Sequence, residues 1–297
     1  MFRKKSSDKS GRIFKMILKS LGSGLVIIFL GTVGLDAVDH YDDLSQSIAG
    51  RIIFGQAKEK CPPDMVLVPA AWGDFCIDRY EVSAAANCPH QNPEGAMQSR
   101  ENIDHEKCLP MSMPQAFPWT NISQNQAAQA CAKAGKRLPS SREWSLAALG
   151  TPDHDSAWGK DDCQVADNWD KQPGLSGSGQ KCVSYVGAFD LIGNVWEWVD
   201  GAVYDGLYEG RPLPDAGYVS GISQEDGFPS STEAFPSPDY YQDYFWIKAK
   251  ETRAIARGGY WNNESQAGQY AYYADAAPSF TGKGVGFRCV KRAENGL

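Results

Sequence analysis

Three short motifs toward the C-terminal end of the chain are dense in glycine, asparagine, tryptophan and arginine. They read Gly-Asn-Val-Trp-Glu-Trp at residues 193–198, Arg-Gly-Gly-Tyr-Trp-Asn-Asn at residues 257–263 and Gly-Phe-Arg-Cys at residues 286–289. Glycine permits the backbone conformations of tight turns, and tryptophan contributes a large buried surface. This combination favours a fold held together by buried indole rings and turns over one built from long helices.

The N-terminus has the pattern of a targeting segment. Residues 1–19 are rich in lysine and arginine, and residues 20–35 form an uncharged apolar run. A basic flank followed by an apolar segment predicts a signal anchor or signal peptide at residues 16–35, with residues 1–19 as a basic cytoplasmic tail. No Ala-x-Ala cleavage site follows closely, which favours an uncleaved membrane helix. The membrane is therefore an expected partner.

Charge and cysteine content restrict the partners and the compartment. The net charge is −7, and the basic residues beyond the N-terminus are dispersed, which argues against a nucleic-acid partner. The chain has eight cysteines, all beyond the apolar run and none in a Cys-x-x-Cys pair. In an exported chain this pattern predicts disulfides and an extracytoplasmic domain, periplasmic or extracellular, that would be secreted if the signal were cleaved.

The rest of the chain divides into segments of different character. Residues 36–60 are polar and weakly patterned, and we expect them to form a stem. Residues 65–69 and 75–82 predict two short strands. Residues 84–115 have no periodicity and are expected to form a long insertion, while residues 201–250 are rich in Gly, Pro, Ser, Tyr and Asp and are expected to form long surface loops.

Two helices are predicted from capping boxes. Ser123 with Gln126, and Ser140 with Glu143, have the spacing at which a serine side chain and the side chain three residues later satisfy each other's backbone amides. Each predicted helix is followed by a glycine, which is a natural residue after a helix C-terminus.

Six motifs follow one another in a definite order: Met-Val-Leu-Val-Pro at 65–69, Asp-Arg-Tyr-Glu-Val at 78–82, Gly-Lys-Arg-Leu-Pro at 135–139 with Glu143-Trp144, Gly-Asn-Val-Trp-Glu-Trp at 193–198, Arg-Gly-Gly at 257–259 and Gly-Phe-Arg at 286–288. In this order they resemble the formylglycine-generating enzyme family, also called sulfatase-modifying factors, over residues 61–292. The resemblance implies an irregular α+β domain of the C-type-lectin-like kind, with little regular secondary structure. Here an N-terminal membrane helix would precede it.

The resemblance also bears on the disulfides. It implies that Cys131, in the helix before Arg-Leu-Pro, pairs with Cys289, directly after Gly-Phe-Arg. By proximity we expect three further pairs: Cys61 with Cys76, Cys88 with Cys108, and Cys163 with Cys182. Cys88 and Cys108 also lie near His90 and His105 in a composition that suits zinc, but an oxidising compartment favours the disulfide.

The family's oxidases use two cysteines shortly after Arg-Gly-Gly that bind copper as thiolates. The resemblance places these positions near Asn263 and Gly268, and no cysteine occurs between Cys182 and Cys289. Soft thiolates select Cu(I), so copper is not supported, and a working formylglycine generator is not expected. The four histidines do not match the three-histidine iron module of another branch, so iron is not supported either. We predict no catalytic residues.

Calcium is the metal that the resemblance leaves open. The family's Gly-Asn-x-Trp-Glu-Trp segment supplies oxygen ligands, which suit a hard cation. Carried over, the ligands would be Asn194, Glu197 and the carbonyl of Val195. The alternative is that Asn194 caps a turn and Glu197 pairs with an arginine, either Arg257 or Arg288.

The segment from 260 to 280 is rich in Tyr, Ser, Gly, Asn and Asp, as binding surfaces often are. We expect an unknown ligand or protein partner to bind there. Three alternatives remain: tyrosines that only pack the interior, an enzyme that oxidatively tailors a secreted peptide or small molecule, and a receptor diversified by retroelements. The expected surface comprises Tyr260, Trp261, Asn263, Gln266, Gln269, Tyr270, Tyr272, Tyr273 and Asp275.

Overall fold

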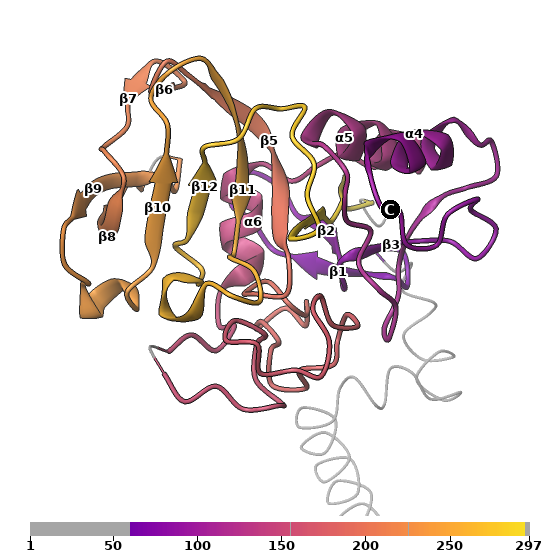
Figure 1. Ribbon diagram of the computed structural model, residues 1–297, viewed down its shortest axis with the longest axis horizontal. Helices are drawn as coiled ribbons and strands as arrows, with labels where there is room; N and C mark the ends of the chain where they lie inside the picture. The colour runs from indigo at the N-terminus through magenta and orange to yellow at the C-terminus, as the bar shows by residue number, and fades with distance from the viewer. Residues whose placement is uncertain (1–59, 155, 225, 295–297) are drawn as a thin grey trace, which may run out of the picture. The chain divides into compact units, whose positions relative to one another are not determined.

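The computed structural model describes residues 60–154, 156–224 and 226–294. Within them the strands form three sheets, of nine, three and two strands, accompanied by three α-helices (Figure 1). The predicted tail, the signal segment and all of the stem except residue 60 lie outside the described residues. Among the described residues, no helix combines the length and apolar character needed to cross a membrane.

The large sheet has the strand order β7-β6-β5-β11-β12-β10-β8-β9, and β13 pairs with β5 beside this path. The pairs β5–β13 and β10–β12 are parallel, and the other pairs are antiparallel. Its strands are β5 (Trp196–Tyr204), β6 (Leu207–Tyr208), β7 (Arg211–Pro212), β8 (Gly217–Ile222), β9 (Pro229–Glu233), β10 (Tyr244–Ile247), β11 (Thr252–Arg257), β12 (Tyr272–Ala274) and β13 (Val285–Phe287).

The remaining elements are short. The three-stranded sheet has the order β1-β2-β14, and the two-stranded sheet joins β3 to β4. These elements, the helices and two 3₁₀ turns are β1 (Met65–Val68), β2 (Phe75–Asp78), β3 (Val82–Ala84), α4 (Ala96–Asp104), β4 (Pro110–Ser112), α5 (Gln124–Lys133), α6 (Ser141–Ala148), η1 (Pro238–Tyr240), η2 (Glu264–Gln266) and β14 (Val290–Arg292).

The large sheet separates two hydrophobic cores, because successive side chains of a strand point to opposite faces. Trp198 and Ala254 pack in the core that includes the buried alanines of α5. Their neighbours Val199 and Ile255 pack in the core that includes the buried face of α6. The sheet therefore lies between α5 on one face and α6 on the other, and β5 is central to both cores.

Both predicted helix starts are confirmed. The Ser123 hydroxyl accepts a hydrogen bond from the amide of Gln126, and the Gln126 side chain accepts one from the amide of Ser123. Ser140 and Glu143 make the same reciprocal pair at the start of α6. Gly135 follows α5 with a φ of +68°, a left-handed conformation that favours glycine.

The expectation that residues 201–250 form long surface loops is wrong, because they contain the end of β5 and all of β6 to β10. Residues 84–115, expected to be a long insertion, contain α4 and β4. The helix α4 was missed because the residues it buries are Ser99 and Asn102, so no apolar period marks it. The strands β6 to β9 are two to six residues long and contain Gly, Ser and Pro, so they resemble loops in composition. The strand β10 reads Tyr-Phe-Trp-Ile, which is a strand-like composition that the description of the whole segment as loops overlooked.

All eight cysteines of the sequence are joined in four disulfides within the described residues, and the four predicted pairs are confirmed. Cys88 and Cys108 are bonded to each other, so neither thiolate is available for zinc. Four disulfides are typical of a domain that matures in an oxidising compartment outside the cytoplasm. The resulting architecture is a mixed, sheet-dominated α+β fold.

The Cys131–Cys289 disulfide spans 158 residues, and the Cys61–Cys76 disulfide spans 15. In the chain-entropy model the first restricts the unfolded chain more, with stabilisations of about 5 and about 3 kcal/mol. We therefore expect the double variant Cys131→Ala/Cys289→Ala to lose more unfolding free energy than Cys61→Ala/Cys76→Ala in urea titrations. An equal or smaller loss would contradict the assigned pairing.

Candidate functional site

The motif at residues 193–198 forms a tight turn that leads into β5. Gly193 and Asn194 both have left-handed backbones, with φ of +76° and +53°. A Cβ atom on Gly193 would lie 2.1 Å from the carbonyl oxygen of Gln164, so only glycine fits there. The turn directs the side chains of Asn194 and Glu197 inward, and both are buried.

Glu197 and Arg288 form a fully buried ion pair. The Arg288 Nε atom lies 2.8 Å from Oε1 and 2.7 Å from Oε2 of Glu197. The indole of Trp144 donates to Oε2 at 2.7 Å, and the guanidinium also donates to the carbonyls of Asp78 and Phe189. Burial is the largest single effect on Arg288 and lowers its pKa, but the charge and hydrogen bonds of Glu197, together with the charges of Glu81 and Asp190, outweigh it and the pKa is raised. The pair thus connects β5, α6 and the end of β2.

Buried carboxyl groups extend this network. The Asn194 amide donates to Oε2 of Glu81 at 2.6 Å. Burial, reinforced by the charges of Asp190 and Glu197, raises the pKa of Glu81 well above its usual value. Burial likewise raises the pKa of Asp190 to about 7. The surroundings thus disfavour the charged forms of both Glu81 and Asp190, which lie beside the ion pair of Glu197 and Arg288.

Arg257 is a second buried guanidinium with different partners. It donates to the Ser141 hydroxyl at 2.8 Å, the Ser145 hydroxyl at 2.9 Å and the carbonyl of Gln269 at 2.7 Å. Its guanidinium carbon lies 3.6 Å from the ring centroid of Tyr272. Arg257 therefore joins β11 to α6 and to the segment before β12, and it does not pair with Glu197.

The residues expected to bind calcium do not fit a calcium ion in this arrangement. Both carboxylate oxygens of Glu197 accept hydrogen bonds from Arg288, and Asn194 Oδ1 accepts one from the amide of Gly174 at 2.8 Å. Calcium takes six to eight oxygen ligands, so an ion would have to displace the guanidinium. The described part of the chain has no group of three or more His, Cys, Asp or Glu side chains suited to a metal. The contacts favour the ion pair, and calcium at Asn194, Val195 and Glu197 stays a prediction.

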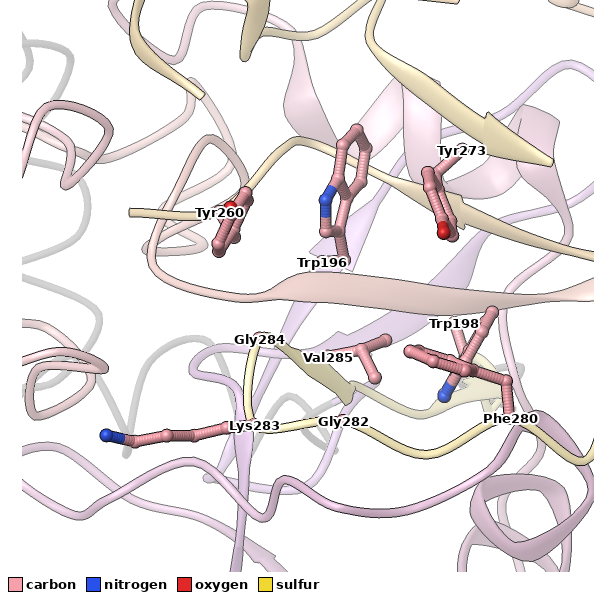
Figure 2. Close-up of a pocket in the computed structure, with 9 residues that line it drawn as sticks. All are labelled: Trp196, Trp198, Tyr260, Tyr273, Phe280, Gly282, Lys283, Gly284 and Val285. Carbon is pink, nitrogen blue, oxygen red and sulfur yellow. The ribbon is translucent and has the colours of Figure 1, made fainter. Parts of the chain in front are cut away.

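A pocket of about 350 Å³ lies where the start of β5 meets β12 and the turn before β13. Figure 2 shows the rings of Tyr260, Trp196 and Tyr273 in a row, with Trp196 in the middle. The centroids of Trp196 and Tyr273 are 5.6 Å apart. The lining is mainly aromatic and aliphatic: Trp196, Trp198, Tyr260, Tyr273, Phe280, Gly282, Lys283, Gly284 and Val285.

The predicted binding residues do not form one surface. Tyr260 and Tyr273 line the pocket. Tyr272 is fully buried in the core on the α6 side, where its hydroxyl donates to the carbonyl of Gly227. Asn263 is not in the pocket lining, but its Oδ1 accepts a hydrogen bond from the amide of Tyr260 at 2.9 Å and so helps to position that residue. The others lie outside the pocket lining: Trp261, Gln266, Gln269 and Tyr270 are half-buried, and Asp275 is exposed.

Several pocket residues were not among the predicted binding residues. Trp196 and Trp198 are buried, at 7% and 0% exposure, yet they also line the pocket. The turn at residues 282–285 was missed as well. Its glycines allow a close approach, since a Cβ atom on Gly284 would lie 3.0 Å from the ring of Tyr260. The Gly-Lys-Gly sequence was the available signal for this turn.

Asn263 and Gly268, the positions that the resemblance assigns to copper-binding thiolates, carry neither sulfur nor imidazole. Every cysteine of the chain is consumed in a disulfide, and the described residues contain no free cysteine. The protein therefore has no thiolate with which to bind copper at this place.

Comparisons with known proteins agree with the motif order. Residues 36–293 match the family described as sulfatase-modifying factor enzyme 1-like domain. A 99-residue segment is 37% identical to a Bos taurus protein named inactive C-alpha-formylglycine-generating enzyme 2, covering 28% of this chain and 32% of that relative.

Solved structures show similarity at low identity. The P3c variant of the major tropism determinant is 18% identical with a TM-score of 0.40, covering 79% of this chain and 54% of that one. PvdO from Pseudomonas aeruginosa is 17% identical with a TM-score of 0.39, covering 77% of this chain and 90% of that one.

The variant Glu197→Gln tests the buried ion pair. It leaves Arg288 uncompensated inside the protein, so we expect a loss of about 3–5 kcal/mol of unfolding free energy. The matched control is Asp170→Asn, which breaks the exposed pair with Lys160 and should change stability little. Urea unfolding measures both. Similar stabilities for the two variants would show that the ion pair is not the main support of the fold.

Proposed function

We propose that this protein is a ligand- or protein-binding module without formylglycine-generating activity. The proposal starts from the finding that the chain belongs to the family of sulfatase-modifying factor enzyme 1-like domains. The observation that carries the proposal is the combination of an intact scaffold with Asn263 and Gly268 at the thiolate positions. Cu(I) prefers soft sulfur ligands, and no cysteine of the chain is free to provide them.

The aromatic pocket is the proposed binding site. Tyr260, Trp196 and Tyr273 offer ring faces and edges, against which a flat apolar group, such as an aromatic ring or the face of a sugar, can pack. Tyrosine hydroxyls and Lys283 supply polar groups at the same place. The ligand is therefore expected to combine a flat apolar part with a polar edge.

The name of the bovine relative supports the absence of catalysis. That protein is described as an inactive formylglycine-generating enzyme, and it shares 37% identity over the aligned segment. The alignment spans 32% of the relative, so its partners are not carried over to this chain.

The proposal includes a location. We place the domain outside the cytoplasm, tethered to the membrane by residues 16–35. Four disulfides support an oxidising compartment, and the basic flank of the apolar run supports the orientation.

A receptor diversified by retroelements is a narrower form of the same proposal. It is favoured because Tyr260, Tyr273 and Phe280 line the pocket and also belong to the segment 260–280, whose composition is typical of binding surfaces.

Quenching of tryptophan fluorescence tests the pocket, because Trp196 and Trp198 line it. A panel of small aromatic compounds, neutral oligosaccharides and peptides is screened against the full chain. For ligands that quench, we expect Tyr260→Ala and Phe280→Ala to weaken binding about tenfold, because each variant removes a ring that packs on the ligand.

The matched control is Phe235→Ala, which removes a ring that is 79% exposed and outside the pocket lining. Its affinity should equal that of the unmodified chain. Ligands that bind all three variants equally would place the binding site elsewhere.

A further inference from the structure

Two aspartates, one fully buried and one partly buried, meet at a place that the pocket does not use. Asp243 precedes β10 and is fully buried, and Asp153 follows α6. The amide of Gln269 donates to Oδ2 of Asp153 at 3.1 Å. The amide of Tyr270 donates to Oδ2 of Asp243 at 2.6 Å. Consecutive amides of one segment thus orient two carboxylates from two other segments.

The two carboxylates converge on Gly268. A Cβ atom built on this glycine would lie 2.0 Å from Oδ1 and 2.4 Å from Oδ2 of Asp243, and 2.5 Å from Oδ2 of Asp153. Because Oδ1 of Asp243 and Oδ2 of Asp153 both lie close to this one point, the two oxygens are close to each other. The backbone of Gly268 is not left-handed, so glycine is needed here for space and not for its φ angle.

The oxygens at this place lack enough hydrogen-bond donors. Oδ1 of Asp243, Oδ1 of Asp153 and the hydroxyl of Thr151 are buried without a hydrogen-bond partner. Arg257 is the nearby positive charge that acts on Asp243, but its hydrogen bonds go to hydroxyl and carbonyl oxygens. Two carboxylates that meet with no hydrogen-bonded cation leave an excess of negative charge, which is unfavourable away from water.

We propose that Asp153 and Asp243 bind a hard divalent cation, Ca²⁺ or Mg²⁺, beside Gly268. Carboxylate oxygens are the ligands that such ions prefer, and sites with two carboxylates complete their coordination with neutral oxygens and water. Thr151, two residues before Asp153 in the sequence, has a buried hydroxyl without a hydrogen-bond partner and is the candidate for a neutral protein ligand. This site is separate from Glu197, whose oxygens are taken up by Arg288.

An ion bound at this site would also affect the segment around Gln269 and Tyr270, which is part of the predicted binding surface. The amides that hold the two carboxylates belong to Gln269 and Tyr270, two residues of the predicted binding surface. A bound ion would fix this segment relative to Asp153 and the start of β10. It would also place oxygen ligands where the resemblance assigns a thiolate, at Gly268, and so exchange a soft donor for hard ones.

Calorimetric titration of the chelator-stripped full chain with CaCl₂ or MgCl₂ tests the site. We expect one ion to bind per chain and to raise the melting temperature. The variants Asp243→Asn and Asp153→Asn should weaken binding about tenfold or more, because each removes one of two charged ligands. Gly268→Ala should weaken it too, since the methyl group would contact both carboxylates.

The control Asp239→Asn changes an exposed aspartate in η1, close to Asp243 in sequence, and should bind like the unmodified chain. Unchanged binding in Asp243→Asn and Asp153→Asn would overturn the proposal by placing the ion elsewhere. If Asp243→Asn does not fold, Asp153→Asn and Gly268→Ala decide the question. Absence of binding, together with stability that increases as the pH falls through 7, would identify a shared proton in place of the cation and would also overturn it.

Discussion

The buried ion pair between Glu197 and Arg288 is the interaction on which the rest of the domain depends. Removing both charges from water is unfavourable, and the arrangement is tolerable only because every charged oxygen and nitrogen is satisfied nearby. Trp144 and two carbonyl groups complete the set of partners. The pair therefore requires α6, β2 and the strands β5 and β13 to be in place at once. This explains why the motifs at 193–198 and 286–289 occur together.

The groups that hold the fold together are different from the residues at the positions where the family's oxidases bind copper. Glu197, Arg288 and Arg257 are all interior groups whose partners are other parts of the chain. They position β5 and β11, and thereby Trp196 at the pocket. None of their hydrogen bonds is made to the residues at positions 263 and 268. The fold can thus be kept without thiolates at these two positions, as the proposed binding function requires.

Local signals in the sequence predicted local structure well. Ser123 and Ser140 mark their helices because a capping box involves only residues three positions apart. The long-range Cys131–Cys289 disulfide was predicted only through the family resemblance. The short strands β6 to β9 were missed because their stability comes from neighbours in the sheet and not from their composition. Of the residues predicted to form a binding surface, Tyr260 and Tyr273 line the pocket, while the turn at 282–285 was not predicted because its role depends on how distant segments pack.

The central claim is that the scaffold is intact while the copper oxidase chemistry is absent. It is tested most directly by incubating the purified full chain with Cu(I), oxygen and a cysteine-containing peptide, and measuring oxygen uptake together with the mass of the peptide. The account predicts no uptake above that of copper alone and an unmodified cysteine. Conversion of the cysteine to formylglycine, at a rate that depends on the folded protein, would contradict it.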